Sequence, residues 1–255
     1  MTDQVTIQDS EPRQYLRQLA MVFDTETTGL LKTYSPPLDP ASLATYPHIL
    51  QISYAIFDTK SWRVVSTTNS FIRVPDDVEI TPEITRITGI TREMCNGGVP
   101  IDVAMRQFYA DYMRCNAIVA HNIDFDRAMI KIEFARIFGN DRAFGNDRVC
   151  HNEYPYWDKI FDPDFENACD KETICTMRWG RNTCKIQCTD RNGKPYWKSP
   201  KLSELYEHLF QEPAPDGLHN ALVDTLVCLR CYVKLRFRFD LRMDTYQAIL
   251  AAPTK

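Results

Sequence analysis

The hydrophobic pattern near the N-terminus is typical of extended strands. Residues 21–24 predict a short strand, in which the apolar Met21, Val22 and Phe23 lead to Asp24. Two longer runs, 48–58 and 62–74, carry β-branched and aromatic side chains at strand-like spacing, with a polar turn between them. The pattern therefore predicts three antiparallel strands that begin a sheet.

The remainder of the chain alternates helical and strand-like segments. Apolar residues at helical spacing or helix-terminating signals predict helices within 81–91, 101–113, 124–138, 201–210 and 220–239. Short apolar runs predict strands at 116–120 and 172–177. Gly139-Asn140 is expected to end the third helix, residues 139–170 to be mostly loop, and 178–201 to be an irregular basic segment.

Strands followed by alternating helices and strands predict an α/β domain with a mixed sheet and helices on its faces. We expect one domain at 19–240, a flexible lead-in at 1–18 and a tail at 241–255. Insertions are expected near 31–48, where four prolines indicate an irregular loop, and near 139–200.

Composition indicates an ordinary globular protein, with 44% hydrophobic and 25% charged residues in a chain of 255. No apolar run approaches the roughly 20 residues that a membrane span needs, and no signal-peptide segment opens the chain. Nine cysteines, an odd number scattered through predicted elements, favour free thiols in a reducing compartment. We therefore expect a soluble intracellular protein without a membrane partner.

Two cysteine groups invite other interpretations. Cys184 and Cys188, with further cysteines and His151 nearby, suggest zinc, but their spacing matches no tight paired pattern. Cys228 and Cys231 form a C-x-x-C on an apolar helix, where core packing is the better interpretation. The net charge of −4 is unfavourable for phosphate binding, although bound cations relax that requirement.

The first candidate chemistry lies at the outgoing end of the first strand. Asp24 and Glu26 are two residues apart, so an extended chain holds both carboxylates on one side. Two close carboxylates cost free energy unless a cation lies between them. A solvated polar turn is the alternative interpretation of a lone D-x-E.

Two further carboxylate positions fall where helices begin. Asp124 and Asp126 follow a predicted strand; they cannot share a helix face, and either could simply cap the helix. Asp224 interrupts an apolar helical run, where a carboxylate needs a partner or a metal, and His219 stands five residues before it. The histidine could be catalytic or structural.

Three of these segments together resemble a known family. FDTETTG, HNIDFD and HNALVD, in this order, look like the three motifs of the DEDD 3′–5′ exonucleases. More narrowly, the chain resembles the DEDDh branch, which is marked by a histidine five residues before the last aspartate. That branch includes the proofreading subunit of bacterial DNA polymerase III. The ITRITGIT and KLSELYEHLF stretches also look like the family, so the resemblance covers about residues 20–236.

The resemblance implies a ribonuclease H-like fold with a five-stranded mixed sheet flanked by helices. It implies that two Mg²⁺ or Mn²⁺ ions are held by Asp24, Glu26, Asp126 and Asp224. His219 is similar to the family's general base, which takes a proton from the attacking water. Thr27 and Leu30 match positions that contact the terminal nucleotide. Oxygen ligands suit these hard cations, and imidazole titrates near neutral pH.

The expected function is therefore two-metal-ion hydrolysis of phosphodiester bonds from the 3′ end of DNA or RNA, releasing nucleoside 5′-monophosphates. The expected partner is nucleic acid with a free 3′ end, single-stranded or frayed, and a polymerase or another replication or repair protein stays open. Alternatives are an exoribonuclease that trims RNA, a non-catalytic nucleic-acid-binding module of the same fold, and a metal-dependent phosphoesterase acting on small substrates.

Overall fold

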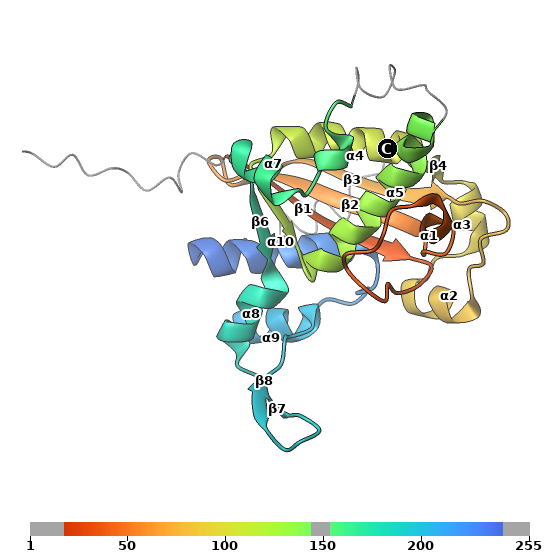
Figure 1. Cartoon of the computed structure of the whole chain (residues 1–255). Helices are drawn as coiled ribbons and strands as arrows, with labels where there is room; N and C mark the ends of the chain where they lie inside the picture. Colours follow the sequence, from red (N-terminus) through yellow and green to blue (C-terminus); the bar gives the residue numbers. More distant parts are fainter. Residues whose placement is uncertain (1–17, 144–153, 242–255) are drawn as a thin grey trace, which may run out of the picture.

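A six-stranded mixed sheet forms the centre of the protein in a computed structural model, which describes residues 18–143 and 154–241 (Figure 1). The strand order is β4-β3-β2-β1-β5-β6. The strands are β1 (Leu19–Thr27), β2 (Ile49–Asp58), β3 (Arg63–Arg73), β4 (Val99–Pro100), β5 (Ala117–Ala120) and β6 (Glu172–Cys175). The expected lead-in and tail lie almost wholly outside the described residues.

The strand directions confirm the predicted mixed sheet, with one correction to the strand number. β1, β2 and β3 are successively antiparallel, whereas β5 and β6 run parallel to β1. The expectation of five strands is wrong, because the two-residue β4 pairs with β3 through Ile72 and Val99. Gly98 permits this pairing: a Cβ there would lie 2.5 Å from the carbonyl oxygen of Phe71, so only glycine fits so close to the backbone.

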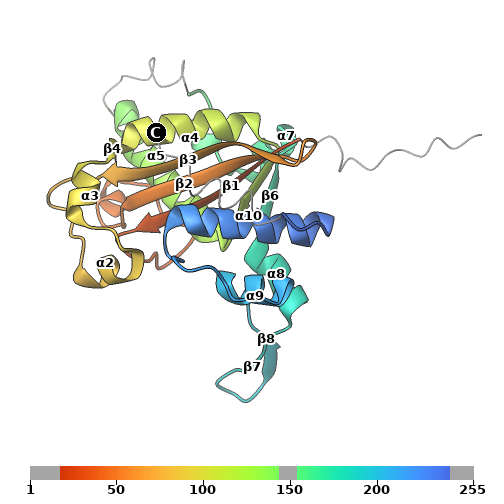
Figure 2. The same ribbon diagram turned by 180° about the vertical axis from the view of Figure 1, so that it is seen from behind.

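Helices cover both faces of the sheet, and the alternation of side chains along β1 supplies both cores. Met21 and Phe23 belong to the core under α4 (Ile101–Arg114) and α5 (Ile123–Ala143). Ala20 and Val22 belong to the core under α10 (Ala221–Phe237), which crosses the other face (Figure 2). The remaining helical segments are α1 (Pro40–Leu43), α2 (Pro82–Thr88), α3 (Arg92–Asn96), η2 (Trp157–Lys159), α7 (Pro163–Ala168), α8 (Thr176–Cys184) and α9 (Leu202–Phe210).

One expectation about the region after residue 138 is wrong, and the expectation that 139–170 is mostly loop is tested only in part, because residues 144–153 lie outside the described residues. Gly139-Asn140 does not end α5, which continues to Ala143; a single glycine costs a helix only about 1 kcal/mol relative to alanine. The region 139–170 also contains η2 and α7. Asp162 begins α7 by accepting backbone hydrogen bonds from Asp164 and Phe165, with Pro163 at the first helical position.

The basic segment after β6 is more regular than expected. It comprises α8 and then a hairpin of β7 (Gln187–Thr189) and β8 (Pro195–Trp197), which projects away from the central sheet (Figures 1 and 2). Trp179 packs against the core under α10. Tyr196 and Trp197 of the hairpin are 46% and 45% exposed. Trp179 therefore belongs to the core, whereas Trp197 lies on the surface.

The described cysteines are free thiols. Cys228 and Cys231 are buried in α10, which confirms that their C-x-x-C is part of the packing. Cys150 and His151, which entered the zinc hypothesis, lie outside the described residues. Within residues 18–143 and 154–241, no helix is long and apolar enough to cross a membrane.

Candidate active site

The outgoing end of β1 carries the first two carboxylates. Asp24 and Glu26 continue the side of β1 on which Val22 packs under α10. β5 pairs with β1 only from Ala20 to Val22. Beyond Val22 that edge of β1 therefore has no neighbouring strand among the described residues, and the acidic end of the strand is open to the loops and helix starts around it.

Two polar residues of β2 fix the start of α10 beside these acids. The side-chain oxygen of Gln51 accepts a hydrogen bond from the Ala221 N–H at 3.1 Å, and the Thr225 hydroxyl donates to the Ser53 carbonyl at 3.1 Å. In the β1–β2 register, Gln51 lies opposite Glu26, and Ser53 lies opposite Asp24. The first turn of α10 is therefore held next to both carboxylates.

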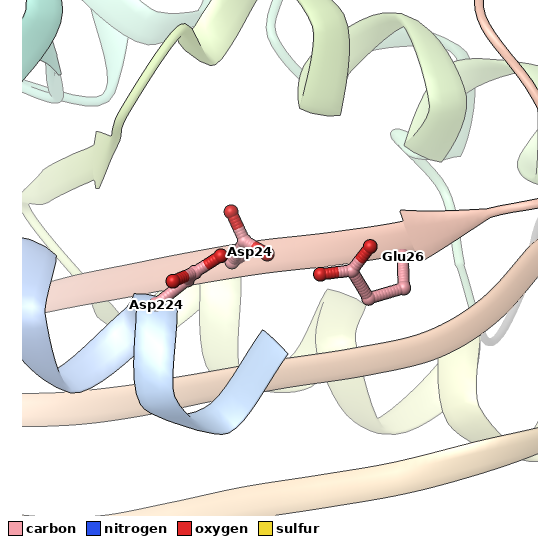
Figure 3. Close-up of side chains that lie close together, drawn as sticks. All are labelled: Asp24, Glu26 and Asp224. Atoms are coloured by element: carbon pink, nitrogen blue, oxygen red, sulfur yellow. The ribbon is translucent and has the colours of Figure 1, made fainter. Parts of the chain in front are cut away.

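This arrangement brings three acids together. One carboxylate oxygen from each of Asp24, Glu26 and Asp224 lies within 4.8 Å of the others (Figure 3). Oδ2 of Asp224 accepts a hydrogen bond from the His219 N–H at 3.2 Å. Oδ1 of Asp224 is buried and has no hydrogen-bond partner among the described residues. A buried carboxylate oxygen without a donor is costly unless a cation is bound, so the donor set fits a divalent metal ion.

The electrostatics of the site lead to the same conclusion. Burial, followed by the charges of Asp126, Asp224 and Glu26, raises the pKa of Asp24 well above its ordinary value. Burial, followed by the charges of Asp224 and Asp126, raises the pKa of Glu26 to about 8. Burial also raises the pKa of Asp224 to about 7. A bound cation favours the charged form of each carboxyl and so opposes these shifts.

Asp126 lies beside the three-acid cluster and is not part of it. It is buried in the first turn of α5, and its Oδ1 accepts hydrogen bonds from the Thr25 N–H at 3.1 Å and the Thr25 hydroxyl at 2.8 Å. Asp126 thereby accepts a hydrogen bond from a backbone N–H of β1 in the part of the strand that β5 does not pair with. Burial raises the pKa of Asp126 to about 7, while the two Thr25 bonds oppose the shift.

The other three expected site residues occupy the rim. His219 is exposed, with a left-handed backbone (φ 70°), in the loop that leads into α10. Thr27 is buried, and its hydroxyl donates to the Gly29 carbonyl at 2.7 Å, so the side chain shapes the turn after β1. Leu30 is 88% exposed just beyond that turn. Its side chain is therefore available to a ligand.

Sequence reasoning missed the residues that position the acids. Thr25 holds Asp126, while Gln51 and Ser53 hold the start of α10. The sequence carried one signal, since Gln51 and Ser53 interrupt an otherwise apolar strand at a spacing of two. From the sequence, Asp124 was expected to be a solvated or helix-capping residue. That carboxylate instead pairs with two arginines, Arg127 at 3.2 Å and Arg178 at 2.6 Å.

The chemistry of the donors distinguishes between metals. Among the residues that the structure describes, Asp24, Glu26 and Asp224 are the only histidine, cysteine or acidic group close enough to hold an ion. Carboxylate oxygens suit hard cations such as Mg²⁺ and Mn²⁺. No described cysteine joins such a group, so Cys184 and Cys188 do not form a zinc site with other described residues.

The mixed sheet flanked by helices has a ribonuclease H-like fold, and three acids gather at the end of its central strand. The model of the RNase T exonuclease family matches residues 21–232, and the chain belongs to this exonuclease family. This family membership confirms the resemblance to the DEDDh-type 3′–5′ exonucleases.

Individual relatives are more distant. The PolC-type DNA polymerase III of Listeria innocua is 28% identical over 116 residues, which is 46% of this chain and 7% of the polymerase. The PolC-type enzyme of Bacillus cereus is 26% identical over 137 residues, covering 53% of this chain and 8% of the polymerase. The chain thus spans less than a tenth of these relatives.

Solved structures of exonuclease I share the fold. Escherichia coli exonuclease I in complex with a dA16 oligonucleotide matches with a TM-score of 0.54 and 15% identity, over 92% of this chain and 43% of that chain. Exonuclease I from Methylocaldum szegediense matches with a TM-score of 0.53 and 17% identity, over 92% and 43%. The present chain therefore spans less than half of either neighbour.

Proposed function

We propose that the protein is a metal-dependent 3′–5′ exonuclease that removes single nucleotides from a free 3′ end and releases nucleoside 5′-monophosphates. The observation that carries the proposal is the convergence of Asp24, Glu26 and Asp224 within 4.8 Å, with one buried oxygen of Asp224 lacking a donor. Membership of the exonuclease family supports the same reaction.

Each residue has a role in this reaction. Asp24, Glu26 and Asp224 hold the cations, and Asp126, beside them, completes the set for two ions. When bound, two divalent cations supply water activation and neutralisation of the charge that develops on the phosphoryl and leaving oxygens. His219 accepts the proton of the attacking water and passes it to solvent, for which its exposed position is suited. Thr27 and Leu30 contact the terminal nucleotide.

We propose DNA with a single-stranded or frayed 3′ end as the substrate. The similar proteins support this choice, since exonuclease I was solved with DNA oligonucleotides and the curated relatives are DNA polymerases. An association with a polymerase or another replication or repair protein is supported by those relatives alone. RNA trimming is the alternative, because both nucleic acids present the same scissile phosphate.

Digestion of matched 5′-labelled substrates tests the proposal. Single-stranded DNA, duplex DNA and RNA of one sequence are incubated with Mg²⁺ or Mn²⁺, and products are resolved at single-nucleotide length. We expect a ladder shortening from the 3′ end, fastest on single-stranded DNA, and none with EDTA. A faster ladder on RNA would favour the exoribonuclease alternative. No ladder on any substrate would leave only a binding module or a small-molecule phosphoesterase.

A further inference from the structure

A pocket adjoins the motif that contains Asp126 and lies apart from the three-acid cluster. It has a volume of about 280 Å³, and its lining residues come from the loop between β1 and α1, from α5 and from the segment that leads into α7. Its walls combine apolar, aromatic and cationic side chains. Tyr34, Arg127 and Lys131 are among them.

The pocket is connected directly to the second acidic motif. Arg127 follows Asp126 in α5, and Lys131 lies one turn further on the same face of the helix. The ring of Tyr34 meets Phe125 edge to face, with centroids 6.3 Å apart. Phe125 precedes Asp126, so the aromatic wall of the pocket is in contact with the second acidic motif.

Cationic side chains lie in and beside the pocket although the chain as a whole has a net charge of −4. Asp124 forms ion pairs with both Arg127 and Arg178, whose side chains are nonetheless 34% and 50% exposed. Lys131 is half-buried between this pocket and a second one of about 320 Å³. No ion pair or hydrogen bond of its ammonium group is found among the described residues. Of the two cations that line the pocket, Arg127 is therefore paired with Asp124 and Lys131 is not paired with any described residue.

The nearby acids on α7 are engaged elsewhere. Asp162 caps α7 through two backbone N–H groups. Glu166 binds the hydroxyls of Tyr112 and Thr173. Both carboxylates lie close enough to act on the charge of Lys131, but neither forms an ion pair with its ammonium group, which can therefore also bind an external anion.

Cations beside an exposed aromatic ring match the way single-stranded nucleic acid is bound, with phosphates on the basic groups and bases stacked on the rings. Tyr34 is 44% exposed. We propose that this pocket is a subsite for nucleotides 5′ of the scissile phosphate, with Arg127 and Lys131 binding backbone phosphate and Tyr34 stacking a base. The assignment rests on the proposed function: in removal from a 3′ end only the terminal nucleotide lies beyond the scissile bond, so contacts outside the reaction centre belong to the remaining strand.

Substrate length tests the subsite. The kcat/KM of Tyr34→Ala, Lys131→Gln and Arg127→Gln is measured on a single-stranded octadeoxynucleotide and on the p-nitrophenyl ester of thymidine 5′-monophosphate, which is too short to reach the pocket. We expect the preference of Tyr34→Ala for the octanucleotide over the ester to fall by about 5- to 150-fold, the loss of one stacked base. The slope of the logarithm of the octanucleotide binding constant against the logarithm of salt concentration should become shallower in Lys131→Gln and Arg127→Gln. The expected change is about 0.7 for each phosphate that loses its cation.

Matched controls lie at the opposite end of the sheet. Lys60→Gln and Arg63→Gln change exposed cations next to Asp58, which pairs with Leu19 at the start of β1. These variants should keep the wild-type substrate preference. The subsite is refuted if the three pocket variants keep the wild-type preference and salt slope, or if they lose octanucleotide and ester hydrolysis by the same factor. A wild-type protein that hydrolyses neither substrate would instead refute the proposed function.

Discussion

The backbone N–H of His219 donates a hydrogen bond to Oδ2 of Asp224 at 3.2 Å. His219 lies in the loop before α10 and has a left-handed backbone, with φ of 70°. Its N–H bonds to Asp224 in the first turn of that helix. The expected general base and an expected metal ligand are thereby joined in one structural unit. The bond leaves Oδ1 of Asp224 without a partner among the described residues, which is where a cation is expected.

Replacing the imidazole should separate its catalytic role from its structural one. Asparagine tolerates a left-handed backbone better than most residues, so His219→Asn keeps the N–H bond to Asp224. We expect kcat to fall about 10²- to 10⁴-fold, as is typical when a general base is lost, while metal-induced thermal stabilisation is retained. The measurement is kcat across pH on an oligonucleotide. A variant at the wild-type rate would exclude His219 as the base.

Neutralising a metal-binding acid should abolish activity without unfolding the protein. In Asp224→Asn or Asp24→Asn, turnover should fall to background because the cations lose a charged ligand. The metal-free variants should melt higher than metal-free wild type at pH 8, because an unpaired buried charge is removed. Asp58→Asn, at the far end of β1, is the matched control and should keep wild-type turnover. Retained turnover in Asp24→Asn or Asp224→Asn would contradict the ligand assignment.

The stability of the metal-free protein should fall as pH rises. The folded state raises the pKa of Glu26 to about 8 and those of Asp126 and Asp224 to about 7. It therefore binds more protons than the unfolded chain, whose carboxyls titrate near pH 4. The stabilisation is complete below about pH 4 and is lost progressively up to about pH 8.

Calorimetry in EDTA should accordingly show a melting temperature that declines between pH 5 and pH 8. Addition of Mg²⁺ at pH 8 should reverse the decline, because the ionised carboxylates then have a partner. The Asp224→Asn variant should show a shallower decline than wild type. A metal-free melting temperature that rises over this range would show that the acids are not destabilised by one another.

The projecting hairpin is a second candidate surface for nucleic acid. Lys194 and Lys201 are exposed near Tyr196 and Trp197, whereas Lys198 is paired with Glu204 at 2.6 Å. Combined Lys194→Gln and Lys201→Gln substitutions should reduce the salt slope of single-strand binding by about 0.7 for each phosphate that these lysines neutralise. Fluorescence anisotropy of a labelled oligonucleotide between 50 and 200 mM salt provides the measurement, with Lys60→Gln as control. An unchanged slope would remove the hairpin from the interface.

The elements with a clear period could be predicted from the sequence. β2 and β3 follow from their runs of β-branched and aromatic residues, and α4 follows from its apolar repeat. α10 follows from a long apolar run, because it is buried on most of its sides. The elements that were missed depend on other information. β4 has only two residues and exists because Gly98 lets two backbones meet. The hairpin after α8 buries little and so leaves no periodic trace.

The acids of the site were found through motif order, but their arrangement was not predictable. Asp224 lies next to Asp24 because Gln51 and Ser53 hold the start of α10. Each does so through a hydrogen bond between residues about 170 positions apart in the sequence. Asp126 was expected among the ligands, yet its hydrogen bonds are with Thr25, next to the cluster. The sequence motifs identify the acidic residues. Which of their oxygens come close together depends on long-range hydrogen bonds.

The central claim is that Asp24, Glu26 and Asp224 bind catalytic divalent cations. It is tested most directly by diffraction from crystals soaked in Mn²⁺, with data collected to locate manganese by its anomalous scattering. The account predicts anomalous peaks within coordination distance of the three carboxylates, including Oδ1 of Asp224, and none in Asp224→Asn crystals. Wild-type crystals with manganese at saturating concentration and no peak at these oxygens would contradict it.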